Sequence, residues 1–144
     1  MEISHSKQLP YSADEIYALV NNINAYPDFL PWCTSAVVTE ESQSHLVATV
    51  GVAAGKVKQK FTTENSMRPG RFIEMRLVEG PFKYLHGEWN FIPISEHACT
   101  ISLQIEFEFK SKLLKLALSS TFNKIMNSMV ESFTQRAREI YGNR

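Results

Sequence analysis

Histidines and cysteines are the side chains in this chain best suited to acid–base, nucleophilic or metal chemistry. The four histidines are far apart in the sequence, and none stands in an H-x-x-x-H pair or beside clustered cysteines: His5, His45, His86 and His97. The two cysteines, Cys33 and Cys99, are too few for a disulfide framework or a structural zinc site. No nucleophile elbow, P-loop or dinucleotide-binding glycine motif occurs. The sequence therefore predicts no catalytic residue, no metal ligand and no enzyme.

The N-terminal part is expected to supply one strand and two short helices. Residues 1–9 form a short mixed segment that we predict to be the first strand. Ser12 followed by Glu15 fits a capping box, and apolar residues at helical spacing then predict a helix over 13–22. A second, shorter helix is expected over 26–30.

A long central region alternates between apolar and polar side chains. The alternation is carried by five stretches: 46–52, 57–63, 73–77, 85–91 and 99–109. Alternation with a period of two indicates strands with one buried face and one wet face, and the short turn-like separators imply an antiparallel meander. Glu106 and Glu108 share a strand face, but the pattern places them on the wet one.

The period changes after Phe109. Apolar residues recur every three or four positions, and neither proline nor glycine interrupts residues 111–141. This pattern predicts one helix of about 30 residues, roughly 45 Å long at 1.5 Å per residue. Gly142 is expected to end it.

These elements predict one α+β domain over residues 1–144, with a curved antiparallel sheet of six to seven strands wrapped on a long C-terminal helix. A single helix does not fill the concave side of a strongly twisted sheet, and the two short helices would close one end of the gap. The remaining apolar space suits a hydrophobic small molecule. A plain hydrophobic core produces the same alternation, so both interpretations stay open.

The composition limits the classes of partner that the chain can be expected to bind. The chain has 144 residues, 44% of them hydrophobic, and a formal net charge of zero. Binding to nucleic acid through phosphates would need a local patch, and Lys56, Lys58 and Lys60 on one outer strand face offer one. A solvated face or a guarded edge strand explains the same lysines.

No secretory signal or transmembrane stretch is apparent, so we expect a cytoplasmic protein. The start of the long helix carries four leucines among lysines: Leu113, Leu114, Leu116 and Leu118, with Lys110, Lys112 and Lys115. Some of these leucines could dip into the inner membrane as a peripheral contact, or the helix could roll to bury them against the sheet.

Two stretches identify a family resemblance. They are Tyr26-Pro27-Asp28-Phe29-Leu30-Pro31-Trp32-Cys33 and the segment from Leu77 to Phe91, with the sequence LVEGPFKYLHGEWNF. Together with the order of elements, they resemble the coenzyme Q-binding family of START-like domains, which also includes bacterial ribosome association toxins. The resemblance covers essentially the whole chain.

The resemblance implies a START-like helix-grip fold and two roles of different class. One is binding ubiquinone or a related polyprenyl lipid, as a carrier or chaperone that supports respiration or quinone biosynthesis, with no other cofactor required. The other is binding the large ribosomal subunit and blocking its association with the small one. The family resemblance does not choose between them.

The expected ligand contacts are inward-facing apolar residues of the strands and the long helix, with the segment before the first long strand. They are Phe29, Leu30, Trp32, Phe61, Met75, Leu77, Phe82, Leu85, Trp89, Phe91, Leu103, Ile105, Phe122, Met126 and Met129. Trp89 could stack on a quinone ring, and the two methionines of the helix suit a flexible tail. Each also fits a plain core, and Phe82 fits either a cavity entrance or a turn.

Overall fold

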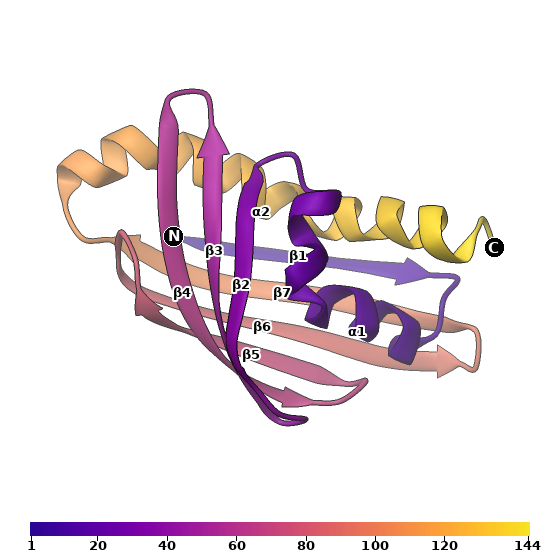
Figure 1. The fold of residues 1–144 in the computed structure, drawn as a ribbon. Helices are drawn as coiled ribbons and strands as arrows, with labels where there is room; N and C mark the ends of the chain where they lie inside the picture. The colour runs from indigo at the N-terminus through magenta and orange to yellow at the C-terminus, as the bar shows by residue number, and fades with distance from the viewer.

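The computed structural model describes residues 1–144, which form one seven-stranded antiparallel sheet with a long helix across one face (Figure 1). The elements follow in the order β1 (Glu2–Leu9), α1 (Ala13–Asn21), the 3₁₀ helix η1 (Ile23–Asp28), β2 (Cys33–Glu41), β3 (His45–Ala54), β4 (Val57–Arg68), β5 (Phe72–Glu79), β6 (Phe82–Ser95), β7 (Ala98–Phe109) and α2 (Lys112–Tyr141). The predicted α+β helix-grip fold is confirmed.

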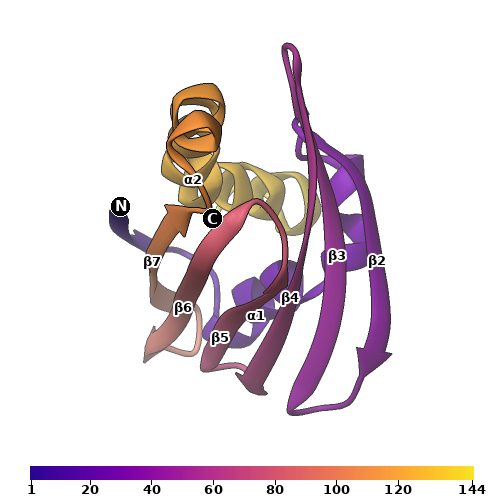
Figure 2. The ribbon, with the colours of Figure 1, turned by 90° about the vertical axis from the view of Figure 1, so that its left-hand side faces the viewer.

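The sheet is a meander with one strand added at its far edge. Its order is β1-β7-β6-β5-β4-β3-β2, so β1 pairs with β7 and the edges are β1 and β2. Register shifts in β2, β4 and β6 add local bulges, which increase twist. Figure 2 shows the strands from β7 to β2 curling around the space beside α2.

The helix α2 begins and ends as its sequence indicates. The Ser111 hydroxyl accepts a hydrogen bond from the Leu114 amide at 3.1 Å. Gly142 ends the helix with φ of +84°, a conformation that glycine adopts without strain. Between these caps, the buried face of α2 packs on the concave side of the sheet, and it includes Leu118, Phe122 and Phe133.

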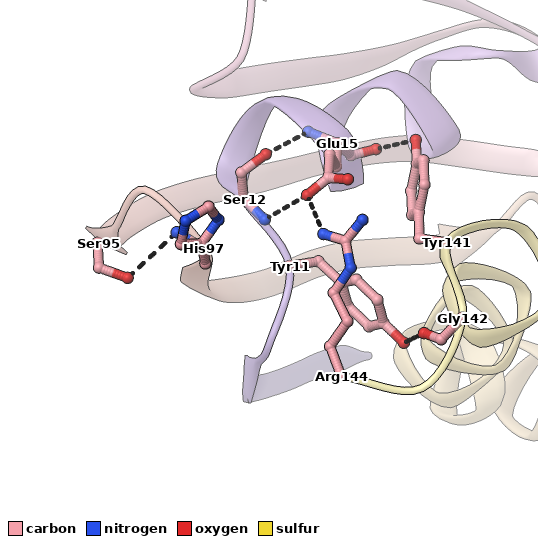
Figure 3. Close-up of polar contacts among 8 residues, drawn as sticks. All are labelled: Tyr11, Ser12, Glu15, Ser95, His97, Tyr141, Gly142 and Arg144. Carbon is pink, nitrogen blue, oxygen red and sulfur yellow. Dashed lines mark hydrogen bonds and ion pairs between the residues drawn. The ribbon is translucent and has the colours of Figure 1, made fainter.

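The C-terminal end of α2 is fastened to the start of α1 (Figure 3). The Tyr11 hydroxyl donates to the Gly142 carbonyl at 2.6 Å, and the Tyr141 hydroxyl donates to the Glu15 carbonyl at 3.0 Å. The Arg144 guanidinium lies 2.8 Å from the Glu15 carboxylate, which also completes the predicted capping box with Ser12. These contacts hold one end of the long helix in place.

Several elements differ from the sequence prediction in type or extent, and β4 and β6 run beyond the alternating stretches 57–63 and 85–91. The second short helix is a 3₁₀ helix over Ile23–Asp28 rather than a helix over 26–30. The sequence predicts the first long strand, β2, without bounds, because it is an edge strand whose residues after Cys33 are only half-buried or exposed, which blurs the alternation. The strand β1 begins one residue later than predicted, and α1 ends one residue earlier.

No helix of the protein is both long enough and apolar enough to cross a membrane.

Candidate apolar ligand site

A small cavity lies between the concave face of the sheet and α2. Its volume is about 60 Å³, and 14 of its 16 lining residues are hydrophobic. The lining consists of Val20, Ile23, Tyr26, Trp32, Val50, Phe61, Thr63, Asn65, Ile73, Met75, Leu85, Trp89, Leu103, Ile105, Met126 and Met129. The wall of the cavity therefore comes from α1, η1, the five strands β3 to β7, Trp32 just before β2, and α2.

Nine of the fifteen predicted contact residues lie in this wall. They are Trp32, Phe61, Met75, Leu85, Trp89, Leu103, Ile105, Met126 and Met129. Strand alternation brings the sheet residues to one face, and helical spacing places Met126 and Met129 opposite them. The expected inward orientation of Trp89 is confirmed, since only 1% of this residue is exposed.

The other six predicted residues lie outside the cavity wall. They are Phe29, Leu30, Leu77, Phe82, Phe91 and Phe122. Phe82 is not at an entrance: it is buried, with its ring centroid 5.1 Å from that of Phe122 and 6.1 Å from that of Phe61. This aromatic cluster packs the core beyond one end of the cavity, because aromatic rings bury large apolar areas in edge-to-face pairs.

Several lining residues were not predicted. Val20, Ile23 and Tyr26 come from the two short helices, whose inward side depends on the tertiary arrangement. Val50 and Ile73 continue alternations already recognised. Asn65 lies two residues beyond the predicted end of its strand, on the same face as Phe61 and Thr63. Extending that alternation by one step would have found it.

The cavity wall contains no charged residue. Its ionisable side chain is Tyr26, whose hydroxyl donates to the Val20 carbonyl and whose pKa is raised mainly by burial. The polar residues of the wall are Thr63 and Asn65. The arrangement is therefore suited to holding an apolar molecule rather than to moving protons.

The size of the cavity limits what enters without rearrangement. A cavity of about 150 Å³ accommodates benzene, which is more than twice the 60 Å³ found here. A ring with a polyprenyl tail would have to displace side chains. Met75, Met126 and Met129 are the residues of the wall best able to move, because methionine is unbranched and flexible.

The lysine patch lies on the outer surface. Lys56, Lys58 and Lys60 are all exposed. The first part of β4, Val57–Phe61, pairs with β3 but extends beyond its pairing with β5, which starts at Thr62. Although β4 is a central strand, one side of this part is not paired with another strand. Charged side chains such as these lysines also protect an exposed strand edge from pairing with another chain.

The leucines at the start of α2 divide into two pairs. Leu118 is buried and Leu114 is half-buried, whereas Leu113 is 77% exposed and Leu116 is 83% exposed. Lys112, just before Leu113, and Lys115, just before Leu116, are exposed as well. The helix thus does not roll far enough to bury all four leucines.

One polar cluster on the outside of the sheet was invisible in the sequence. Glu74, His86 and Glu88 have potential ligand atoms within 4.8 Å of one another. Glu74 already pairs with His86 at 3.0 Å and with Arg76 at 3.3 Å. Its hydrogen bonds from His86 and Arg76 lower the pKa of Glu74. These contacts account for the cluster as a surface ion-pair network across neighbouring strands.

Known proteins share this architecture. Residues 9–134 match the family described as polyketide cyclase/dehydrase and lipid transport. The chain belongs to this family. It is 44% identical over 141 residues to the ribosome association toxin RatA of Vibrio cholerae, covering 98% of each chain. It is 26% identical to the mitochondrial coenzyme Q-binding protein COQ10 of Dictyostelium discoideum, covering 95% of this chain and 69% of that protein.

Among solved structures, the Zhui aromatase/cyclase of a Streptomyces species superimposes with a TM-score of 0.85 at 16% identity, covering 97% of this chain and 95% of that chain. At this identity the likeness shows the fold alone. The suspected family is therefore confirmed, and its members include proteins named for a ribosomal role and for coenzyme Q binding.

Proposed function

We propose that this protein is a non-enzymatic carrier or chaperone for a polyprenylated quinone such as ubiquinone. The observation that carries the proposal is the uncharged, apolar cavity between the sheet and α2. Burial of an isoprenoid tail there would supply about 25 cal/mol per Å² of apolar area. The similarity to a protein named for coenzyme Q binding supports a ligand that has a quinone ring as well as an isoprenoid tail.

The wall of the cavity favours binding over catalysis. None of its 16 residues is an aspartate, glutamate, histidine, lysine, arginine or cysteine. Tyr26 is hydrogen-bonded to a backbone carbonyl, and burial holds it in its neutral form. The wall therefore lacks the acids, bases and thiols that most often do acid–base or nucleophilic chemistry, and its hydroxyl groups are those of Thr63 and Tyr26.

We expect the ligand to enter by displacement of the flexible part of the wall. The C-terminal end of α2 is held by Tyr11, Tyr141 and Arg144 (Figure 3). Its middle is tied to β1, where Lys7 lies 2.8 Å from Glu131. The N-terminal part of the helix has fewer such ties, so a shift there opens the cavity at the least cost.

The exposed leucines at that end favour a membrane surface as the place of lipid exchange. Leu113 and Leu116 present apolar side chains to solvent, flanked by Lys112 and Lys115. Apolar side chains among cations suit the boundary between acyl chains and anionic headgroups. The protein would then act as a cytoplasmic carrier with a peripheral contact at the inner membrane.

Lipid extraction and mass spectrometry of the protein purified gently from its own cells test the carrier function. We expect a polyprenyl quinone at near-stoichiometric amounts. In a reconstituted assay, Leu103→Trp should fill the cavity and weaken quinone binding, because Leu103 lines it. Ile101→Trp is the matched control, since Ile101 is equally buried on the same strand but outside the wall. Quinone binding that survives Leu103→Trp in a folded protein would contradict the proposal.

The 44% identity to a protein named ribosome association toxin supports a second candidate function, binding to the large ribosomal subunit. The exposed lysines of the β3–β4 hairpin, Lys56, Lys58 and Lys60, would contact ribosomal RNA phosphates. This hairpin projects beyond the rest of the sheet in both views (Figures 1 and 2).

Co-sedimentation with purified large subunits tests the second function. Reversing the charge of all three lysines should abolish association, and raising the salt concentration should weaken it in the unmodified protein. Association that persists in the triple variant would exclude this patch. The quinone assay on the same variant shows whether the two functions separate, because the lysines lie outside the cavity wall.

A further inference from the structure

An asparagine lies in the apolar wall of the cavity without a partner for its oxygen. Asn65 on β4 is 2% exposed, and its Oδ1 atom has no hydrogen-bond partner. Trp32, also in the wall, has a buried Nε1 atom that likewise lacks a partner. By contrast, the hydroxyl of the buried Thr134, outside the wall, donates to the Val130 carbonyl at 2.8 Å.

Such a group is unfavourable in a ligand-free core. Buried polar side chains in proteins are nearly always hydrogen-bonded, and leaving one unpaired costs its full desolvation. A leucine of similar size would avoid that cost in this otherwise apolar wall, where Asn65 pairs across the sheet with Met75. We therefore expect the amide at position 65 to lower the stability of the ligand-free protein relative to leucine, a cost typical of residues that serve binding.

We propose that Asn65 recognises the oxygen-bearing head group of the ligand. The amide nitrogen can donate to a carbonyl oxygen, and the amide oxygen can accept from a hydroxyl. One asparagine therefore serves both the oxidised quinone and the reduced quinol. This inference rests on the proposed carrier function and names the ligand class: an isoprenoid with an oxygenated ring, rather than a plain hydrocarbon.

The test compares two probes on two variants. The probes are a ubiquinone with two isoprene units and an isoprenoid hydrocarbon of similar length, each measured by displacement of a fluorescent apolar dye. Asn65→Leu should weaken quinone binding about tenfold, the contribution of one hydrogen bond, and change hydrocarbon binding less than twofold. Thr134→Val removes a buried polar group away from the wall and should leave both affinities unchanged.

A stability measurement separates recognition from a structural role. If Asn65 serves the ligand, Asn65→Leu should raise the midpoint of thermal unfolding of the ligand-free protein while it weakens quinone binding. A lowered midpoint would mean that the amide stabilises the fold, and would overturn the inference.

The outcomes also distinguish this inference from the function on which it rests. If both proteins bind both probes and Asn65→Leu binds the quinone as tightly as the unmodified protein does, head-group recognition by Asn65 is overturned. Binding of apolar molecules in the cavity then still stands, and the amide bonds at most to water. Failure of the unmodified protein to bind either probe overturns the carrier function itself.

Discussion

Truncation of Met126 to alanine tests whether the cavity is a closed space that must grow before a ring enters. Met126 is 5% exposed and lies in the cavity wall on α2. The change removes three heavy atoms from the side chain and joins the space they occupied to the existing cavity. Where no cavity adjoins the residue, truncation leaves only the space that the side chain vacates, whereas here that space adds to the existing cavity.

The magnitude follows from burial and volume. Loss of three buried groups costs about 2.4 kcal/mol at about 0.8 kcal/mol each. If the new space equals the present cavity of about 60 Å³, the cavity term adds about 1.4 kcal/mol at about 24 cal/mol per Å³. We expect the free energy of unfolding to fall by about 3 to 4 kcal/mol, and the enlarged cavity to approach the roughly 150 Å³ that holds benzene.

Urea unfolding with and without benzene measures both effects. Benzene should stabilise Met126→Ala by about 2.7 kcal/mol at 100 times its dissociation constant and leave the unmodified protein unchanged. Met67→Ala is the matched control, because Met67 is also 5% exposed but lies outside the wall. It should lose similar stability without gaining a benzene site. Equal benzene stabilisation of the unmodified protein and Met126→Ala, or a loss below about 1 kcal/mol, would refute the closed-cavity argument.

Three further predictions concern the surface and the thiols. Changing Leu113 and Leu116 together to serine should weaken binding to anionic lipid vesicles about tenfold or more, measured by vesicle co-sedimentation, with neutral vesicles as the control; unchanged binding would exclude this end of α2. The backbone hydrogen bond from Ser12, with a smaller effect of Arg144, holds the pKa of the Glu15 carboxyl group below its ordinary 4.5. The ionised carboxylate therefore contributes its full stabilisation of the folded protein above about pH 4.5, and this contribution is lost as the pH falls through the lower pKa of the folded state. Glu15→Gln should therefore flatten the acid limb of a stability–pH curve, and an unchanged limb would assign the acid loss to other carboxylates. Burial raises the pKa of Cys33 and raises that of Cys99 to about 11, so thiol labelling at pH 8 should be slow in the folded protein and fast in denaturant; rapid labelling of the folded protein would show that the core opens locally.

The sequence predicted the parts of the fold that depend on local periodicity. The alternation from Cys99 to Phe109 places every second residue of β7 in the core, because neighbouring side chains of a strand point to opposite faces. The recurrence of apolar residues every three or four positions predicted α2 to within one residue at its start. These two patterns predicted four of the cavity contacts, namely Leu103, Ile105, Met126 and Met129.

What the sequence did not predict depends on neighbours distant in the chain. The bounds of β2 were not predicted, because its residues after Cys33 are half-buried or exposed and show no clean alternation. Phe82 and Phe122 point inward, as their spacing indicates, but they pack against the wall residue Phe61 and do not themselves line the cavity. Periodicity indicates which side chains point into the core, but it does not indicate how far each of them lies from the cavity.

The tertiary structure alone decided the character of the site. It determined that the cavity is small, that its wall lacks charge, and that Asn65 reaches it from β4 with an unpaired oxygen. It also determined that Leu113 and Leu116 stay exposed while Leu118 is buried. Volume, exposure and hydrogen-bond pairing are properties of atoms brought together by the whole fold, whereas local sequence fixes only which residues share a face.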